Sequence, residues 1–392
     1  MPRLLLLTPS ELTRDPRARR AAASALARGF EVVGLCGRLG GGEAASLDGV
    51  PVMRVGHERV ARTLRRAGAG ELTESRPLVR ELRGVFRIGR VVTLTAQLRA
   101  AARRLGGVDV VHANDFATLP AAWLAARAND ARLVYDAHEL YAQEEASMPV
   151  TYRAFVRALE GFLARRAHAV VTVSEPLARE LAQELRLRRP PLVVLNAPPR
   201  EEVDEPRRSD GPLRAVYQGA VAPGRPLEDL WAAVAAFDGV ELTVRVAGAD
   251  PEALRRAVAL RGLEGRVRIA EPVPPDRLVA ALAGHDVGVI FNRPRAGHYQ
   301  VALPNRLFEY MMAGLAVVAP RLPAVAEIVD GDGIGITYEP GSPAALGAAL
   351  AELAADRESV AAFGRRARKR ALDRYNAEIE SVQLARAWGL HS

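Results

Sequence analysis

Short apolar segments alternate with longer amphipathic segments along almost the whole chain, and this alternation constrains the fold more than any other feature. The apolar segments are hydrophobic without interruption, which indicates strands buried on both faces. The Ala-, Leu- and Arg-rich stretches between them have helical spacing. The pattern therefore predicts parallel sheets covered by helices, with strands at 4–8, 30–35, 52–55, 108–112, 133–136, 170–173, 192–195, 213–217, 242–247, 267–270, 287–291, 316–319 and 334–338.

One stretch without apolar periodicity interrupts this alternation. Its sequence, NAPPREEVDEPRRSDGP at 196–212, is rich in proline and charge, which is typical of a linker. Open parallel sheets bind ligands beyond the carboxyl ends of their strands, so two such domains facing one another would form a cleft for two substrates. We predict a first domain at 1–196, a linker at 197–212, a second domain at 213–375 and a C-terminal helix at 376–392 that could pack back on the first domain.

The composition excludes several classes of protein. Hydrophobic residues make up 49% of the 392 residues, which argues against a disordered chain. A single cysteine, Cys36, rules out a disulfide framework and a multi-cysteine zinc site. It also fits a reducing cytoplasm, which is the location we expect. No apolar run reaches the roughly 18 residues of a membrane-spanning helix, and the start MPRLLLLTPSEL indicates a first strand rather than a secretion signal.

The residues that follow the first strand argue against two common nucleotide-binding motifs. A dinucleotide-binding domain carries G-x-G-x-x-G at this point, and a P-loop protein carries a Walker A sequence. The segment TPSELTRDPRARR contains no glycine. Nicotinamide redox chemistry and P-loop phosphoryl transfer are therefore disfavoured.

The segment ALPNRLFEYMMAGLAVVAP, at 302–320, carries the most information about function. Pro304 suits the first position of a helix, where its missing N–H costs nothing. The free N–H groups at a helix start can bind a phosphate. Glu309 lies within two turns of that end and could accept both hydroxyls of a ribose. The same residues also fit an ordinary helix with a surface glutamate.

Together with four other segments, this motif resembles the retaining glycosyltransferases of family 4, which have the GT-B fold. The other segments are VDVVHANDFATLP, LVYDAHELY, VVTVSEPLAREL and YQGAVAPGRPLEDL. The resemblance extends from the first strand to about Tyr338. It implies an α/β GT-B fold of two Rossmann-like domains facing across a cleft. The acceptor would bind the N-terminal domain and the nucleotide-diphosphate sugar the C-terminal domain.

The resemblance also assigns roles to individual residues. Glu309 would hold the donor ribose, Arg225 the donor diphosphate, and His138 the donor sugar or its phosphate, which makes these three the candidate catalytic residues. Taken alone, Arg225 fits an exposed arginine and His138 a structural histidine. The other donor-side candidates are Gly219, Leu303, Pro304 and Asn305, and the acceptor-side candidates are His112, Asn114 and Asp115.

Two positions depart from the family pattern. Many members carry a second acid where this chain has Val301, and an arginine where it has Ala220. The sugar contacts would then come from the 298–305 loop, which leaves the transferred sugar undetermined. A sugar-nucleotide epimerase of the same fold and a non-catalytic nucleotide-sugar-binding module therefore remain alternatives.

The sequence predicts no metal ion and no cofactor besides the sugar nucleotide. Asp330, Gly331 and Asp332 form a D-x-D pattern, but their DGDG context is typical of a turn. The one cysteine and seven scattered histidines suggest no metal site. Ser174 is better explained as the cap of a helix starting near Pro176 than as a nucleophile.

The positive charge is concentrated in one segment. Residues 76–104 contain eight arginines and one acid, Glu81, a net charge of +7 against +8 for the whole chain. Apolar residues interleave at helical spacing, so the segment could bind an anionic acceptor or the inner face of a membrane, or be a solvated helix with its apolar side on the core. No aromatic stacking set accompanies the arginines, so nucleic acid is not expected as a partner. The resemblance leaves a glycan, a lipid-linked or a small-molecule acceptor open.

Overall fold

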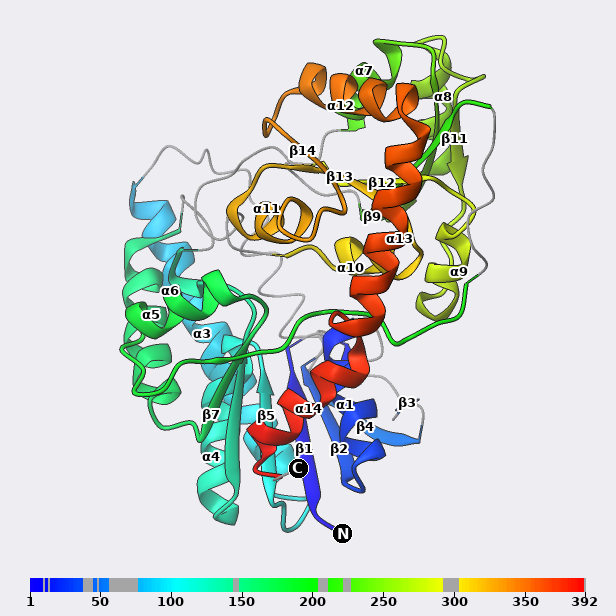
Figure 1. The fold of residues 1–392 in the computed structure, drawn as a ribbon. Helices are drawn as coiled ribbons and strands as arrows, with labels where there is room; N and C mark the ends of the chain where they lie inside the picture. Colours follow the sequence, from blue (N-terminus) through cyan, green and yellow to red (C-terminus); the bar gives the residue numbers. More distant parts are fainter. Residues whose placement is uncertain are drawn as a thin grey trace. The chain divides into compact units, whose positions relative to one another are not determined.

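The computed structural model describes residues 1–9, 11–12, 15–37, 45–47, 49–55, 77–143, 148–203, 211–220, 227–291 and 303–390. They form two compact units (Figure 1). One comprises Met1–Val194 with Glu380–Ser392, and the other comprises Leu195–Ile379. Each unit is a sheet with helices on both faces, which confirms the predicted α/β class.

The first unit contains a sheet of strand order β3-β4-β2-β1-β5-β6-β7-β8, parallel except for the β3–β4 pair. Its strands are β1 (Arg3–Thr8), β2 (Glu31–Gly37), β3 (Ala45–Leu47), β4 (Val50–Val55), β5 (Val110–Asn114), β6 (Arg132–Ala137), β7 (Ala169–Thr172) and β8 (Leu192–Val193). Its helices are α1 (Pro16–Ala27), α3 (Pro77–Ala102), η2 (Phe116–Thr118), α4 (Leu119–Asn129), η3 (Tyr141–Gln143), α5 (Val150–Ala164), α6 (Glu175–Glu184) and the greater part of α14 (Ala377–Trp388).

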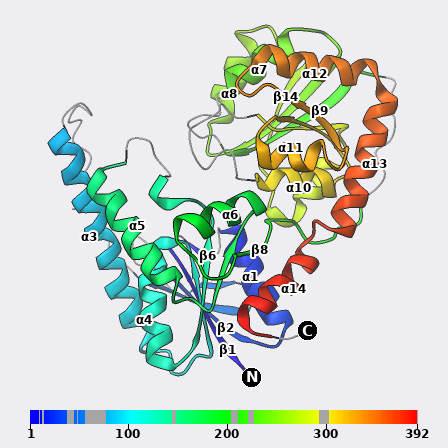
Figure 2. The ribbon, with the colours of Figure 1, turned by 60° about the vertical axis from the view of Figure 1, so that its left-hand side comes forward.

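Helices cover this sheet on both faces. One hydrophobic cluster joins α1 to Leu384, Ala387 and Trp388 of α14, against side chains of β1, β2 and β5. Figure 2 shows α3, α4 and α5 on the other side of the sheet. Because the strands are parallel, their carboxyl ends lie at a common edge, where polar loop residues can meet.

The second unit contains a parallel sheet of strand order β11-β10-β9-β12-β13-β14. Its strands are β9 (Leu213–Ala220), β10 (Val240–Ala247), β11 (Val267–Ala270), β12 (Val287–Val289), β13 (Ala316–Pro320) and β14 (Gly335–Tyr338). Its helices are α7 (Leu227–Ala235), α8 (Pro251–Ala259), η4 (Pro275–Arg277), α9 (Leu278–Leu282), α10 (Asn305–Met312), α11 (Pro323–Val329), α12 (Pro343–Ala355) and α13 (Arg357–Asp373).

Strand β13 illustrates why the strands are apolar without interruption. Ala316 and Val318 belong to the hydrophobic cluster formed with α7 and α12, whereas Val317 and Ala319 belong to the cluster formed with α10 and α11. Successive side chains of a strand point to opposite faces, so a sheet with two covered faces needs apolar residues at every position. The other predicted strands are all present, and the same reasoning explains the central ones. Strands β4 and β11 are buried less completely, since Pro51 and Arg268 are exposed. Strand β3 was not predicted.

Helix α3, which contains most of the basic segment, packs against the start of α5. A Cβ on Gly84 would lie 2.5 Å from Thr151 Oγ1 and 2.8 Å from Pro149 Cβ, so only glycine allows this approach. Glu81 accepts hydrogen bonds from the backbone N–H groups of Val150 and Thr151, each at 3.0 Å. The single acid of the segment is thus occupied in capping α5.

Not all of the apolar side of α3 faces the core. Val91 and Leu98 are buried. Leu78, Leu82, Val85 and Phe86 are 73%, 51%, 59% and 50% exposed, and their spacing places them on one face of the helix. Among the described residues, no helix is both long enough and apolar enough to cross a membrane.

Candidate functional site

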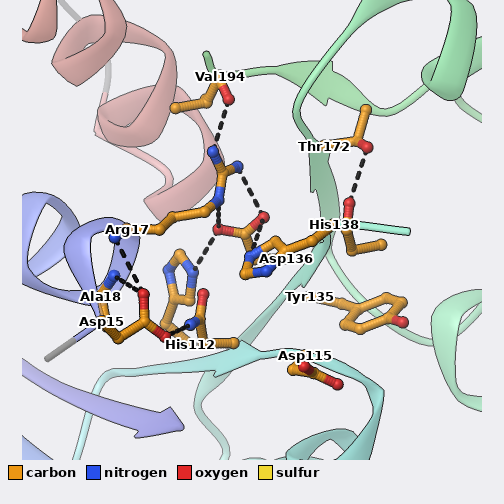
Figure 3. Close-up of polar contacts among 12 residues, drawn as sticks. Asp15, Arg17, Ala18, His112, Asp115, Tyr135, Asp136, His138, Thr172 and Val194 are labelled. Atoms are coloured by element: carbon orange, nitrogen blue, oxygen red, sulfur yellow. Dashed lines mark hydrogen bonds and ion pairs between the residues drawn. The ribbon is translucent and has the colours of Figure 1, made fainter. Parts of the chain in front are cut away.

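In the first unit, a buried carboxylate lies at the ligand-binding edge of the sheet. Asp136, next to last in β6, is 1% exposed and lies opposite Asn114, the last residue of β5. Its two oxygens accept hydrogen bonds from Nε and Nη2 of Arg17, each at 2.7 Å (Figure 3). A two-pronged arginine–carboxylate pair of this kind is among the strongest and most directional polar contacts in proteins.

Two histidines approach the same carboxylate (Figure 3). Nε2 of His112, in β5, lies 3.5 Å from one oxygen of Asp136, and Nε2 of His138, just after β6, lies 3.4 Å from the other. His112 is fully buried, whereas the side chain of His138 is 23% exposed. His138 is therefore the histidine that a bound molecule could reach.

The surroundings of Asp136 decide its protonation state. Burial alone would raise the pKa of this carboxyl. The Arg17 guanidinium and the two histidines act more strongly in the opposite direction, so the pKa lies well below its usual range. Asp136 is therefore a fixed negative charge at neutral pH, and its role is to orient the groups around it.

The C-terminal helix contributes to this arrangement. Nε1 of Trp388, in α14, donates a hydrogen bond to Nδ1 of His112 at 3.0 Å. With Nδ1 accepting, a neutral His112 carries its proton on Nε2, the nitrogen that faces Asp136. Trp388 thus selects the tautomer of His112 that can donate to the carboxylate.

Local sequence explains how Arg17 reaches Asp136. The side chain of Asp15 caps α1 by accepting from the backbone N–H groups of Arg17 and Ala18 at 3.0 and 3.1 Å, and a proline follows at the first helical position. Asp15 also accepts from Nδ2 of Asn114 at 2.9 Å. The helix start is thereby tied to β5, with Arg17 directed at β6.

The acceptor-side candidates His112, Asn114 and Asp115 thus lie together with His138 at one sheet edge. Asp115 directly follows β5 with a φ of +83°, and its side chain accepts from the N–H of Ala117 at 3.3 Å. Burial raises the pKa of Asp115, while the nearby His138 lowers it by a smaller amount. A left-handed aspartate at a strand end is a strained conformation of the sort found at binding sites.

In the second unit, Glu309 lies on α10 and is joined to the neighbouring strand. Nε2 of Gln218, in β9, donates a hydrogen bond to the Glu309 carboxylate. Tyr310 also joins α10 to the sheet. Its hydroxyl accepts from the N–H of Gln218 and donates to the carbonyl of Val289, both at 3.1 Å. Glu309 is therefore a positioned carboxylate and not a freely moving surface group.

The start of α10 differs by one residue from the prediction. Pro304 is the N-cap and not the first helical residue, because its ψ of 136° is extended, and Asn305 begins the helix. Leu303 packs against the hydrophobic cluster of α10 and α11. Gly219 lies in β9 next to its last residue, Ala220.

Arg225 and Val301 lie outside the described residues, as do residues 298–302 of the loop predicted to contact the sugar and residues 204–210 of the predicted linker. Their roles stay as predictions.

The D-x-D pattern forms a turn, as predicted. The Asp330 carboxylate accepts from the Thr337 hydroxyl at 3.0 Å, and Asp332 accepts from the Tyr375 hydroxyl at 2.8 Å. Within the ranges that the structure describes, no group of three or more His, Cys, Asp or Glu side chains could hold a metal ion. Ser174 caps α6 by accepting from the N–H of Leu177 at 3.2 Å, which confirms its predicted role.

Sequence reasoning assigned no role to several residues of these two sites. They are Asp15, Arg17, Asp136 and Trp388 in the first unit and Gln218 and Arg306 in the second. The only local signal was the position of Arg17 directly after the loop that follows the first strand, where ligand-binding residues belong.

The two halves of the chain match two models of glycosyltransferase domains. Residues 17–197 match the model of Glycosyltransferase Family 4, and residues 215–356 match that of Glycosyl transferases group 1. The chain is a glycosyltransferase. No curated protein matches the sequence of this glycosyltransferase.

Solved structures share the fold of the glycosyltransferase over nearly its whole length. Sucrose-phosphate synthase from Thermosynechococcus elongatus aligns with a TM-score of 0.73 at 16% identity, covering 99% of this chain and 98% of that one. HepE from Anabaena in complex with UDP aligns with a TM-score of 0.68 at 15% identity, covering 99% of this chain and 100% of that one. A TarM mutant from S. aureus in complex with Fondaparinux, alpha-GlcNAc-glycerol and UDP aligns with a TM-score of 0.72 at 8% identity. This alignment also covers 99% of this chain and 100% of that one. The glycosyltransferase thus has the GT-B fold.

Proposed function

We propose that the enzyme transfers a sugar from a nucleotide-diphosphate donor to a glycan, lipid-linked or small-molecule acceptor. The observation that carries the donor half is the Glu309 carboxylate, fixed by Gln218 one helical turn into α10. A carboxylate held in this way can accept both hydroxyls of a ribose, while the start of α10 favours phosphate. The structural neighbours HepE and TarM, whose complexes contain UDP, support a donor of this kind.

In this proposal the first unit positions the reacting sugar through His138. Nε2 of His138 faces Asp136 at 3.4 Å, so a neutral His138 protonated on that nitrogen offers Nδ1 as an acceptor for a sugar hydroxyl. Asp115 would face the acceptor, next to the buried Asn114 at the end of β5. Arg225 would stabilise the negative charge that develops on the leaving diphosphate, which makes a metal ion unnecessary. The family 4 match of the first half supports retention of the anomeric configuration.

The test of the donor site is Glu309→Gln, with Glu327→Gln on α11 as the matched surface control. Removing a charged hydrogen-bond acceptor should weaken nucleoside diphosphate binding by about 10- to 100-fold, measured by calorimetry, while the control binds normally. Unchanged binding by the Glu309 variant would refute the site. Activity in the presence of EDTA tests independence from metal ions.

The reaction class is tested by release of nucleoside diphosphate from a panel of sugar donors, with and without acceptors. Acceptor-dependent release, with the sugar recovered on the acceptor, supports transfer. Product formed from the nucleotide sugar alone, without an acceptor, would indicate an epimerase. Ligand binding without turnover, including no slow hydrolysis of the donor, would indicate a binding module.

The exposed side of α3 suggests where the enzyme works. The apolar row of Leu78, Leu82, Val85 and Phe86 runs beside a row of arginines at positions 80, 83, 87 and 90, also at helical spacing. An exposed apolar row beside a cationic row matches the interface of an anionic lipid surface. We therefore include the cytoplasmic face of a membrane as a partner of this helix.

Sedimentation with phosphatidylcholine vesicles, with and without phosphatidylglycerol, tests this surface. Each arginine near an anionic membrane contributes about 1 kcal/mol. Reversing Arg83, Arg87 and Arg90 to glutamate should therefore reduce binding to the anionic vesicles more than tenfold. Reversing Arg255, Arg256 and Arg261, three exposed arginines of the second unit, changes the net charge by the same amount and is the matched control. Equal binding by the α3 variant, or no vesicle binding by the wild type, would overturn the proposal.

A further inference from the structure

Arg306, the second residue of α10, is a buried cation with unused hydrogen-bonding capacity. It is 6% exposed, and its Nη1 has no hydrogen-bond partner in the part of the chain that the structure describes. Burial lowers the pKa of this guanidinium, but Tyr217, Tyr310 and Glu309 raise it by more, so Arg306 stays charged. A buried guanidinium nitrogen without a hydrogen-bond acceptor is rare in folded proteins, because nothing replaces the water it has lost.

The surroundings hold the guanidinium in one place. Its central carbon lies 4.8 Å from the centre of the Tyr217 ring, a cation–π contact. A Cβ on Gly219 would lie only 2.6 Å from Nη2 of Arg306, so the absence of a side chain at Gly219 makes room for the arginine. Tyr217 and Gly219 both belong to β9, and Gly219 lies at its carboxyl end.

This position coincides with the place where a ligand is expected. Parallel sheets bind ligands at the carboxyl ends of their strands, and glycine there allows a phosphate or another backbone to come close. Glu309 lies one turn further along the same helix and is engaged by Gln218. The start of α10 and the end of β9 thus present a carboxylate, Glu309, that can bind hydroxyl groups and a guanidinium, Arg306, that can bind an anion.

We propose that Nη1 of Arg306 binds the diphosphate of the sugar donor, as a cationic ligand in addition to Arg225. This inference rests on the proposed function, since it assigns a further residue to the same donor site. A diphosphate fits better than a sugar hydroxyl because a guanidinium binds phosphate oxygens with charge-assisted hydrogen bonds. As negative charge moves to the leaving diphosphate, the same contact strengthens.

The experiment compares binding of a nucleoside, its monophosphate and its diphosphate, using the uridine, thymidine, adenosine and guanosine series and calorimetry. Arg306→Gln should weaken diphosphate binding by about 10- to 100-fold and nucleoside binding by less than about twofold, because only the phosphates lose a partner. The salt dependence of diphosphate binding should also decrease. Arg306→Lys should lie in between, and Arg255→Gln, an exposed arginine of the same unit, should match the wild type.

Gly219→Ala gives an independent test that leaves Arg306 itself intact. The new Cβ should displace the guanidinium and selectively weaken diphosphate binding, and the double variant with Arg306→Gln should be no weaker than the single variants. Equal losses for nucleoside and diphosphate in every folded variant would show a structural role and overturn the inference. Unchanged diphosphate binding would do the same. If the wild type binds no nucleotide of any series, the proposed function itself fails, which is a separate outcome.

Discussion

The two sites of this glycosyltransferase differ in how completely their charges are paired. In the first unit, Asp136 receives both prongs of Arg17 and the approach of two histidines. In the second, Glu309 is engaged by Gln218, whereas Nη1 of the buried Arg306 is unpaired among the described residues. We call the first a closed network because its buried carboxylate and guanidinium are paired, although Nε2 of His112 and Nε2 of His138 have no hydrogen-bond partner among the described residues. We call the second an open network.

The difference indicates what each site is built to do. A closed network holds its members rigidly, and a ligand meets only its rim, which here is His138. An open network keeps a buried donor without an acceptor, and an anionic ligand can supply that acceptor. We therefore expect substitutions in the first network to affect mainly stability, and substitutions in the second to affect mainly ligand binding.

The largest expected effect comes from breaking the closed network with Asp136→Asn. The buried Arg17 guanidinium would then lose the carboxylate that accepts two of its hydrogen bonds, which costs about 3–5 kcal/mol in the free energy of unfolding. Urea denaturation measures this loss, with Glu180→Gln on α6 as the surface control. Replacing Arg17 by methionine in the same variant should restore part of the stability. A loss below about 1 kcal/mol would contradict the closed-network description.

The second prediction contrasts Asp136 with another buried acid of the first unit, Glu160. Among the described contacts, Glu160 has no arginine partner. It accepts a hydrogen bond from the Tyr135 hydroxyl at 2.7 Å. Burial raises its pKa to about 8, from 4.5. The proton is thus bound more tightly in the folded state, so stability should fall as pH rises from about 4.5 to 8, by about 1.4 kcal/mol per unit at most.

The variant Glu160→Gln, which mimics the protonated acid, should remove this fall and be more stable than the wild type at pH 8. Denaturation curves at pH 5, 6.5 and 8 measure the effect. The contribution of Asp136 to the pH dependence of stability has the opposite sign. Because its pKa is lowered in the folded state, Asp136 stabilises the fold above the ordinary pKa of aspartate, and this stabilisation is lost only in acid. A wild-type protein whose stability does not change across this range would disprove the assignment for Glu160.

A smaller effect should come from loosening the open site with Gln218→Leu. Glu309 would lose the hydrogen bond from Gln218 but keep its charge, so nucleoside binding should weaken by about tenfold, while stability changes by about 1 kcal/mol. The ratio of diphosphate to nucleoside affinity should stay the same, because Arg306 is untouched. Calorimetry gives the affinities, with Gln383→Leu as control. A selective loss of diphosphate affinity would contradict the proposal that Glu309 binds the ribose and Arg306 the diphosphate.

The smallest expected effect is that of Trp388→Phe. The change removes the hydrogen bond to His112 but keeps an aromatic ring against Phe30, whose centre lies 5.6 Å from that of Trp388. The cost should be about 1 kcal/mol. The 15N chemical shifts of the His112 ring should show a mixture of tautomers instead of one. A single unchanged tautomer would show that Asp136 alone selects it.

Much of the architecture could be predicted from the sequence because it depends on local pattern. Uninterrupted apolar runs marked the strands, since both faces of each sheet are covered. Ser174 and the turn at Asp330 were recognisable from short-range capping and turn chemistry. Strand β3 has only three residues and pairs at the sheet edge, so it lacks the long buried run that identified the others.

The exposed row on α3 shows the limit of such patterns. Helical spacing revealed an amphipathic segment, but spacing alone does not say which apolar residues meet the core. Gly84 and its fit against Pro149 and Thr151 fix how the helix packs on α5. Only that packing leaves Leu78, Leu82 and Phe86 exposed.

By itself, the sequence determined two α/β units, their strands, and the residue types available at the ends of those strands. The tertiary structure decided which of these residues meet. Arg17, His112, Asp136 and Trp388 are far apart in the chain and come together only because β1, β5 and β6 are neighbours and α14 packs on the same sheet. Strand order and helix docking follow from the packing of whole elements, so no local pattern specifies them. Arg306 was visible in the motif from the start, but its burial and its unpaired nitrogen exist only in the folded unit.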